Sequence, residues 1–469
     1  MGIRRTTAII TAKVFSRACR LAGKQGTTMA GKLAMRMDPS ILKDLAAQVR
    51  RKIFVVCGTN GKTTTNNLIC SALEAEGAKV VCNRLGANML IGVTAAFVQA
   101  ASPGGKLDAD YACIEVDEAS AQRIFPYFKP DYMVITNLFR DQLDRYGEID
   151  TTIDLLKKAI DLDENLTLIA NGDDPLVTYL AKSCGRESIF FGITEKVFDN
   201  ENSGEIREGR FCKFCGERLS YEYYHYGQMG LYRCPGCGQA RPEVDYDAGH
   251  IRMEKGLDFD LTVRNDLQSD DAAGKETKNA ARKFVRHIHA DYRGFYNIYN
   301  ILAAYAAADA VGLPLNHFDT VLAEYNPQNG RNELFEIDGC RVLLNLAKNP
   351  AGFNQNIGSV MEDPTDKDII IVINDNAQDG KDISWLWDVD FDRFGEESIQ
   401  SILVSGIRCH DMRLRLKYAG IDCKMVPEVK SAVTDRIKSG CKNLYVLVNY
   451  TALYDTHVLL KGMAGHGGK

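Results

Sequence analysis

The stretch Val55–Thr65, which reads VVCGTNGKTTT, decides the fold of the first half of this chain. Two apolar residues run into a pair of glycines, Gly58 and Gly61, and a lysine and three threonines follow. Glycines let backbone N–H groups approach phosphate oxygens, and the N-terminus of a following helix adds a positive dipole. Lys62 can reach the β- and γ-phosphates of a nucleotide, and the Thr63 hydroxyl can ligate Mg²⁺. We therefore predict a nucleotide-binding strand–loop–helix, with a loop shorter than the usual one.

Short apolar runs alternate with helical segments on both sides of this loop. The expected strands of the first half are IFVVCG (53–58), KVVCN (79–83), YACIEV (111–116), YMVITN (132–137) and LTLIAN (166–171). A second set follows: RVLLNLA (341–347), DIIIVIND (368–375), SILVSG (401–406) and LYVLVNY (444–450). Such alternation predicts an α/β fold with parallel sheets covered by helices. We expect a helical segment over 1–49, a nucleotide-binding domain over 50–325 and a second, Rossmann-like α/β domain over 326–469.

Composition restricts the class of protein further. The 469 residues are 45% hydrophobic and 25% charged, which is typical of a globular protein, and no run is apolar enough to span a membrane. A net charge of -5 gives no general attraction to nucleic acid. Most of the 14 cysteines stand singly, many in apolar runs, so we expect reduced thiols and a cytoplasmic location.

The first residues, MGIRRTTAIITAKVFSRACRLAGK, are basic and amphipathic. We expect a helix that packs four apolar side chains on the body of the protein: Ile9, Ile10, Val14 and Phe15. Three alternatives stay open, namely a transit peptide, contact with the inner face of the membrane, and myristoylation, whose pattern Gly2 and Thr6 fit.

Carboxylates follow the predicted strand at 111–116. Glu115, Asp117 and Glu118 come at its end, and the carboxyl ends of parallel strands beside a phosphate loop suit Mg²⁺. Glu115 and Asp117 share one face of the strand and Glu118 lies on the other. A solvated acidic loop is the alternative interpretation.

Two Cys-x-x-Cys pairs interrupt the first α/β rhythm within an insertion over about 205–245. Cys212 and Cys215 precede Cys234 and Cys237, and each pair stands in a glycine-containing knuckle, CKFCG or CPGCG. Four thiolates at this spacing predict a structural zinc ribbon, with a redox pair as the alternative. The aromatic segment between the pairs, YEYYHYGQMGLYR, is expected to form a structural hairpin, although aromatic residues can also stack nucleic acid bases.

Two further clusters carry polar side chains. FVRHIHA (284–290) places His287 and His289 on one face of a strand, where we expect an ordinary hairpin face rather than a metal site. The stretch 372–392 crowds acidic residues around two tryptophans: Asp375, Asp379, Asp382, Asp388, Asp390, Trp385 and Trp387. A generic acidic loop is the simplest interpretation of the second cluster.

Taken together, these segments resemble the Mur ligases and folylpolyglutamate synthases, whose shortened loop GTNGKTTT matches. GANMLIG, IEVDE, NLFRDQLDRYG, NGDDP, GFYNIYNILAA, NGRNE and NLAKNPAG follow in the order of that family. The resemblance implies ATP and Mg²⁺, with nucleotide and magnesium contacts from Gly58, Thr59, Asn60, Gly61, Lys62, Thr63, Thr64, Asn88, Glu115, Asn297 and Arg331. In that family Asn297 would meet the adenine, Arg331 the γ-phosphate, and Lys348 would be a basic residue facing the phosphates.

The same resemblance implies a reaction in which a substrate carboxylate becomes an acyl phosphate, which an amine then attacks. Two residues depart from the family pattern: Gln142 replaces a histidine that helps hold a second metal in many relatives, and Asn345 replaces an aspartate. Only about 50 residues precede the loop, so we expect no full N-terminal domain for a nucleotide-linked substrate. A standard amino-acid-adding ligase is therefore disfavoured.

The second half extends the resemblance to the synthetase subunits of lipid II isoglutaminyl synthases, through NLAKNPAG, the Asp–Trp stretch and SGIRCHDMRLRLKYAG. That resemblance implies amidation of the α-carboxylate of D-glutamate in lipid II, with ammonia from a separate glutaminase subunit of the GatD type. It also implies that an aspartate of the second domain completes the partner's Cys–His pair; we choose Asp379, with Asp382 as its rival. A self-contained ligase that adds an amino acid is the alternative, and a nucleic-acid-dependent ATPase the third candidate.

Overall fold

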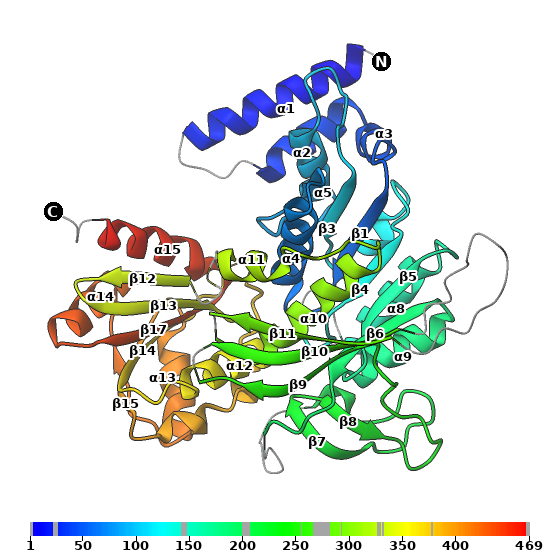
Figure 1. Cartoon of the computed structure of the whole chain (residues 1–469). Helices are drawn as coiled ribbons and strands as arrows, with labels where there is room; N and C mark the ends of the chain where they lie inside the picture. The colour runs from blue at the N-terminus through cyan, green and yellow to red at the C-terminus, as the bar shows by residue number, and fades with distance from the viewer. Residues whose placement is uncertain are drawn as a thin grey trace.

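The structure is a computed structural model of the 469-residue chain, described here for residues 3–21, 27–141, 148–198, 207–254, 256–265, 282–291, 293–325, 330, 333–376 and 379–465. Two α/β units lie side by side, and the described part of the chain begins and ends on helices at the periphery (Figure 1). Within the described residues, no helix combines the length and apolar character needed to cross a bilayer. The polar stretch 266–281 lies outside this description.

A nine-stranded sheet forms the first unit. In spatial order its strands are β11 (Arg282–Ala290), β10 (Leu257–Asn265), β9 (Tyr246–Arg252), β6 (Ser188–Ile193), β5 (Thr167–Asn171), β4 (Tyr132–Ile135), β1 (Lys52–Cys57), β3 (Tyr111–Glu115) and β2 (Val80–Cys82). The pairs from β2 to β9 are parallel, and β9, β10 and β11 pair antiparallel. The predicted parallel α/β sheet is therefore confirmed.

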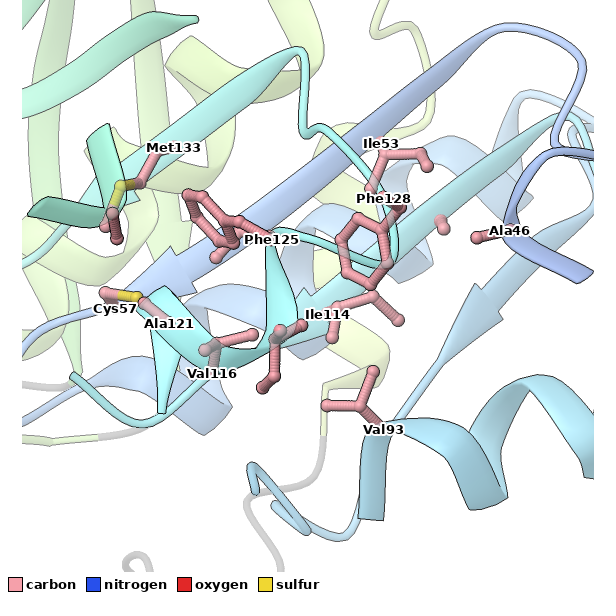
Figure 2. Close-up of a cluster of buried hydrophobic side chains, with 14 of the residues drawn as sticks. Ala46, Ile53, Cys57, Val93, Ile114, Val116, Ala121, Phe125, Phe128 and Met133 are labelled. Carbon is pink, nitrogen blue, oxygen red and sulfur yellow. The ribbon is translucent and has the colours of Figure 1, made fainter. Parts of the chain in front are cut away.

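Helices cover both faces of this sheet, and β1 shows why. Its alternate residues Ile53, Val55 and Cys57 face one core, while Phe54 and Val56 face the other. The first core includes α5 (Leu90–Ala100), α6 (Ala121–Ile124), α8 (Ile149–Ile160) and α9 (Pro175–Cys184); Figure 2 shows part of it around Ile114 and Phe125. The second core includes α4 (Lys62–Ala75), α10 (Tyr296–Asp309) and α11 (Phe318–Glu324).

Three N-terminal helices, α1 (Ile3–Leu21), α2 (Thr27–Met37) and α3 (Ile41–Ala46), pack beside α5, with α1 outermost (Figure 1). The face of α1 that packs carries the small residues Ala8, Ala12 and Ser16, which lie at a spacing of four and are buried. Small residues let the α1 backbone approach α2 closely.

This packing corrects part of the prediction for the N-terminus. Ile9 is buried and Phe15 packs against the core, as expected. Ile10 and Val14 are exposed, because they lie on the face opposite the small residues.

The cysteine-rich insertion lies between β6 and β9. A short 3₁₀ helix η1 (Glu208–Arg210) leads into the antiparallel hairpin of β7 (Ser220–Tyr226) and β8 (Met229–Arg233). Three tyrosines of the hairpin, Tyr223, Tyr226 and Tyr232, are buried against the first unit. Rings buried in this way are not available to stack nucleic acid bases.

A six-stranded sheet forms the second unit. Its spatial order is β12 (Glu333–Ile337), β13 (Cys340–Leu346), β17 (Asn443–Val448), β14 (Lys367–Val372), β15 (Ile399–Ser405) and β16 (Lys424–Met425). All pairs except β12 with β13 are parallel. It is accompanied by α12 (Pro350–Met361), η2 (Ser384–Asp388), η3 (Phe391–Gly395), α13 (Cys409–Tyr418), α14 (Val429–Lys438) and α15 (Tyr450–Ala464).

Candidate active site

The phosphate loop leaves β1 and enters α4, and two of its glycines are required by close contacts. Gly58 and Gly61 adopt positive φ angles of 122° and 84°. A Cβ on Gly58 would lie 2.2 Å from the Thr136 hydroxyl oxygen, and one on Gly61 would lie 2.2 Å from the side-chain oxygen of Asn300. Neither position accepts a side chain without a shift of its neighbours, so both loop positions require glycine.

Asn137, which follows β4, holds the loop in place. Its side-chain oxygen accepts a hydrogen bond from the Asn60 backbone N–H at 2.9 Å, and its backbone oxygen accepts one from Thr59 N–H at 2.8 Å. Its amide also donates to the Asn60 carbonyl at 3.1 Å. Sequence reasoning quoted this segment but did not select Asn137.

Lys62 and Glu118 form a buried ion pair inside the loop. Lys62 Nζ lies 2.9 Å from a Glu118 carboxylate oxygen, and the Gly58 backbone N–H donates to the same oxygen at 2.8 Å. Burial alone would lower the pKa of Lys62, but the carboxylates around it, Glu118 first, outweigh burial and raise that pKa. Glu118 thus supplies the loop with an anionic oxygen of the kind a phosphate would supply.

Thr63, Asn88 and Glu115 converge at the carboxyl end of β3. The Thr63 hydroxyl donates to one Glu115 oxygen at 2.6 Å, and the Asn88 amide donates to the other at 2.8 Å. The side chain of Asn83 fixes the backbone of Glu115 through two hydrogen bonds of 2.8 Å. A carboxylate beside a threonine hydroxyl is an oxygen donor set that Mg²⁺ prefers, so these residues fit the ion.

The two other acidic residues after β3, Asp117 and Glu118, turn to different partners. Asp117 accepts a hydrogen bond from the Ser120 hydroxyl at 3.2 Å, whereas Glu118 turns to Lys62. Thr64 is buried on the first turn of α4. All the predicted loop residues, together with Asn88 and Glu115, therefore gather in one place.

Helix α10 brings two asparagines to the same place, because residues three apart share a helix face. Asn300 donates to the Asn297 side-chain oxygen at 3.0 Å, and its own oxygen accepts from the Thr65 hydroxyl at 3.3 Å. Asn297 also donates to the backbone oxygen of Arg293 at 2.9 Å. Only the first asparagine of YNIYN was selected from the sequence; the repeat at a spacing of three was the signal for the second.

The second unit reaches the loop through the N-terminus of α12. The Asn349 amide donates to the Asn60 side-chain oxygen at 3.2 Å, and Asn349 also caps α12 by accepting from Gly352 N–H at 2.7 Å. Lys348 forms an ion pair with Asp141 of the first unit. The two units therefore meet at the phosphate loop.

Three further residues were singled out from the sequence. Asn345 is buried on β13. Arg331 and Gln142 lie outside the described residues. The contacts predicted for Arg331 with a γ-phosphate and for Asn297 with adenine stay predictions.

The segment Asn137–Asp141 also connects the loop to the ribbon hairpin. Phe139 N–H donates to the Thr59 hydroxyl oxygen at 2.9 Å, and that hydroxyl donates to the Phe139 carbonyl at 3.0 Å. The ring of Phe139 stacks on Tyr226 with centroids 5.9 Å apart, and a Cβ on Gly227 would lie 2.6 Å from this ring. The hairpin tip therefore fixes the position of Phe139, and through it Thr59.

Arg140 joins three parts of the molecule. Its guanidinium forms ion pairs with Asp388 on η2 and, at 3.5 Å, with Glu208 at the start of the insertion. The loop after β4 is thus in contact with the phosphate loop, the ribbon insertion and the second unit.

Comparisons with known proteins show the family of this chain. It is 35% identical, over 96% of each chain, to "Lipid II isoglutaminyl synthase (glutamine-hydrolyzing) subunit MurT" of Staphylococcus aureus strain COL. A subunit of the same name from Streptococcus pneumoniae R6 is 34% identical over 93% of this chain and 92% of its own. This chain belongs to the MurT family. The family models for the Mur ligase middle domain and the MurT ligase C-terminal domain match residues 56–231 and 346–453.

The fold is shared more widely. A solved structure described as a pseudomurein peptide ligase type C from Methanothermus fervidus superposes with a TM-score of 0.62 at 20% identity, over 88% of this chain and 79% of that one. The expected Mur ligase-type fold is confirmed. Membership of the Mur ligase group implies ATP and Mg²⁺, and the oxygen donors around Glu115 are consistent with Mg²⁺.

The part matched by the MurT C-terminal model contains the two candidate aspartates. Asp379 is buried; one of its oxygens accepts from Thr451 N–H at 2.8 Å and the other from Asn376 N–H at 3.2 Å. Burial raises the pKa of Asp379. Asp382 is half-exposed and accepts from Ser384 N–H at 2.8 Å.

The four insertion cysteines of this MurT-family chain meet at the base of the hairpin. Their sulfurs lie within 4.8 Å of one another: Cys212, Cys215, Cys234 and Cys237. The Cys237 backbone N–H donates to the Cys234 sulfur at 3.5 Å and helps lower the pKa of that thiol to about 7. Four converging sulfurs, one of them readily ionised, fit a tetrahedral metal such as Zn²⁺.

The histidines of β11 have carboxylate partners. His287 and His289 face Asp260 and Asp258 across the pairing with β10, at 3.1 and 3.0 Å. Among the described residues, the cysteine cluster is the group of metal-ligating side chains that converges.

Proposed function

We propose that this chain is the synthetase subunit that amidates the α-carboxylate of D-glutamate in the stem peptide of lipid II, using ATP and ammonia. The observation that carries the proposal is the 35% identity to a MurT subunit over 96% of both chains. The product D-isoglutamine agrees with the isoglutaminyl synthase name of that relative. The convergence of Lys62, Thr63, Asn88 and Glu115 at one sheet edge supports a phosphoryl-transfer step.

In the proposed reaction, an oxygen of the substrate carboxylate attacks the γ-phosphorus of ATP. The bond from that phosphorus to the β–γ bridging oxygen breaks, ADP leaves and an acyl phosphate forms. Ammonia then attacks the acyl carbon, inorganic phosphate leaves, and the nitrogen loses a proton to give the amide. Little covalent chemistry falls to the protein, so its contribution is positioning and neutralisation of charge.

We assign these tasks to residues of this chain. Lys62 would exchange Glu118 for phosphate oxygens, since a cation that already pairs with a carboxylate in the loop can pair with a phosphate there. Thr63 and Glu115 would hold Mg²⁺, which neutralises phosphate charge when bound. We further assign Arg331 to the γ-phosphate and Lys348, beside the loop after β4, to the reacting phosphate.

The ammonia would come from glutamine hydrolysed by a glutaminase partner of the GatD type, as the glutamine-hydrolyzing name of the relatives suggests. We assign the third member of the partner's Cys–His–Asp set to Asp379, with Asp382 as the rival. Asp379 is favoured because two backbone hydrogen bonds hold its carboxylate in one orientation, in which it could orient an imidazole. Asp382 is the rival because it is half-exposed and easier for a docking imidazole to reach. We also assign a structural Zn²⁺ to the four insertion cysteines.

The test uses the purified chain with ATP, Mg²⁺, lipid II and ammonium, followed by mass spectrometry of the stem peptide. We expect replacement of one hydroxyl by an amino group, with stoichiometric ADP. A parallel reaction with radiolabelled amino acids is the control, because transfer of an amino acid to lipid II would instead identify a self-contained ligase. Absence of both products would contradict the proposal.

A further inference from the structure

Helix α1 exposes a stripe of apolar side chains on its outer face. Ile3, Ile10, Val14 and Leu21 are 86%, 44%, 61% and 91% exposed. Their spacings of seven, four and seven residues place all four along one line of the helix, opposite the small residues that pack on α2. Isolated exposed apolar residues are common, but a four-membered line on one helix face is a continuous surface.

The N-terminal segment that carries this stripe is basic. The first acidic residue of the chain is Asp38, and eight lysines and arginines precede it, although the whole chain has a net charge of -5. Arg4 and Arg17 are exposed on α1 itself, and Lys32 and Arg36 are exposed on α2. Arg17 lies three residues after Val14 and therefore beside the apolar line, while Arg4 donates to the backbone oxygen of Met37. An apolar line on a basic segment without carboxylates complements an anionic lipid surface, in which acyl chains lie beneath phosphate groups.

Other basic residues of α1 anchor the helix to the body of the protein. Lys13 Nζ donates to the backbone oxygen of Gln99 at 2.9 Å, and Arg5 forms an ion pair with Asp44. These contacts lie on the packed side, so α1 is held against α2 and α5 (Figure 1). The side chains of its apolar line are exposed on the opposite face of the helix. The surface is therefore preformed and does not require the helix to detach.

We propose that α1, through the outward line Ile3, Ile10, Val14 and Leu21 and the exposed Arg17 beside it, docks this chain on the anionic inner surface of a membrane. The helix would lie in the interface plane, with its axis parallel to the surface. The inference deepens the proposed function, because a lipid-linked substrate is confined to that surface. Binding to lipid itself requires neither ATP nor the substrate.

The test is cosedimentation of the full chain with unilamellar vesicles made from equal parts of phosphatidylglycerol and phosphatidylcholine, without nucleotide. We expect the chain to pellet with these vesicles and to do so much less with pure phosphatidylcholine or at high salt. The double variant Ile10→Ser, Val14→Ser should lower the partition coefficient about tenfold or more, because two apolar side chains no longer enter the interface. Arg17→Glu should lower it severalfold, and only on the anionic vesicles.

Matched controls exclude general effects of the substitutions. Ile407→Ser removes an apolar side chain of 59% exposure from the second unit, and Lys430→Glu reverses an exposed charge on α14. Both should bind vesicles like the unchanged chain. Amidation of a short-chain, water-soluble substrate should be unaffected by the double variant, which separates docking from chemistry.

Three results would overturn the proposal. The first is equal binding of the unchanged chain and the α1 variants to the anionic vesicles, and the second is absence of binding by the unchanged chain. The third is a concentration-dependent dimer, or a complex with the glutaminase partner, that the double variant abolishes without lipid. In that third case the apolar line would be a protein interface.

Discussion

The carboxyl edges of the two sheets hold their acidic groups in opposite ways. At the edge of the nine-stranded sheet, Glu118 pairs with Lys62 at 2.9 Å, and both side chains are 8% exposed. At the edge of the six-stranded sheet, Asp379 is held by backbone donors, including Thr451 N–H at the first turn of α15. An arriving anion can replace one member of a charge pair, whereas a carboxylate held by backbone donors at a helix N-terminus is fixed. The edge of the nine-stranded sheet is therefore suited to bind an anion in place of Glu118. The edge of the six-stranded sheet is suited to hold the Asp379 carboxylate in one orientation.

The largest effect is expected where the charge pair is broken. Lys62→Ala should lower ATP-dependent amidation by at least about 10²–10³-fold, because a cation that offsets developing phosphate charge is lost. It also leaves Glu118 buried without its counter-ion, which should reduce the free energy of unfolding by about 3–5 kcal/mol. ADP release and denaturant unfolding measure the two effects.

The double variant Lys62→Ala, Glu118→Gln separates these effects. A neutral amide can still accept the hydrogen bond from Gly58 N–H, so much of the stability should return while activity stays absent. Recovery of activity in the double variant would show that Lys62 does not act on the phosphates.

The second prediction concerns the fixed edge. Asp379→Asn should reduce glutamine-driven amidation by about 10²–10⁴-fold, because an aspartate that orients a catalytic histidine is lost, and should spare ammonium-driven amidation. Asp382→Asn is the matched variant and should leave both activities unchanged. The measurement compares the two nitrogen sources in the presence of the glutaminase partner.

The two aspartates exchange roles if only Asp382→Asn shows that pattern. A parallel loss of both activities in Asp379→Asn, with a lowered melting temperature, would instead assign Asp379 to the anchoring of α15. Either result would show that Asp379 does not serve the partner's catalytic site.

The smallest effect is expected from the ribbon hairpin, which lies outside both edges. Gly227→Ala places a methyl group against the Phe139 ring, and Phe139 shares two hydrogen bonds with Thr59. A shift of a few tenths of an ångström should raise the KM for ATP about three- to tenfold with little change in kcat, because positioning of the loop is disturbed. Steady-state kinetics with ammonium as nucleophile measures it.

Gly339→Ala is the control for this substitution. Gly339 also has a positive φ, 77°, in a hairpin turn, but nothing lies within 4 Å of its Cβ position. Both variants place an alanine at a positive φ angle, 51° at residue 227 and 77° at residue 339. An equal change in the KM for ATP would therefore mean that the ribbon hairpin does not position the loop.

Local features were predictable because their physical causes lie within a few residues. The apolar run before Gly58 and the lysine after Gly61 identified the strand, the loop and the helix. The spacing of the four cysteines likewise anticipated the convergence of their sulfurs. Asn137 and Asn300 were missed because their partners Asn60 and Thr65 stand 77 and 235 residues away, and asparagine is too common to mark such a contact.

The sequence by itself determined the parallel α/β architecture, the phosphate loop and the cysteine cluster, since periodicity and spacing encode each of them locally. Only the tertiary structure decided that the ribbon hairpin meets Phe139, that Glu118 fills the loop beside Lys62, and which face of α1 packs. Amphipathic periodicity offered two faces for α1, one of small residues and one with Ile10 and Val14. Close approach to α2 selected the small residues, because packing depends on the shape of both helices and that shape exists only after folding.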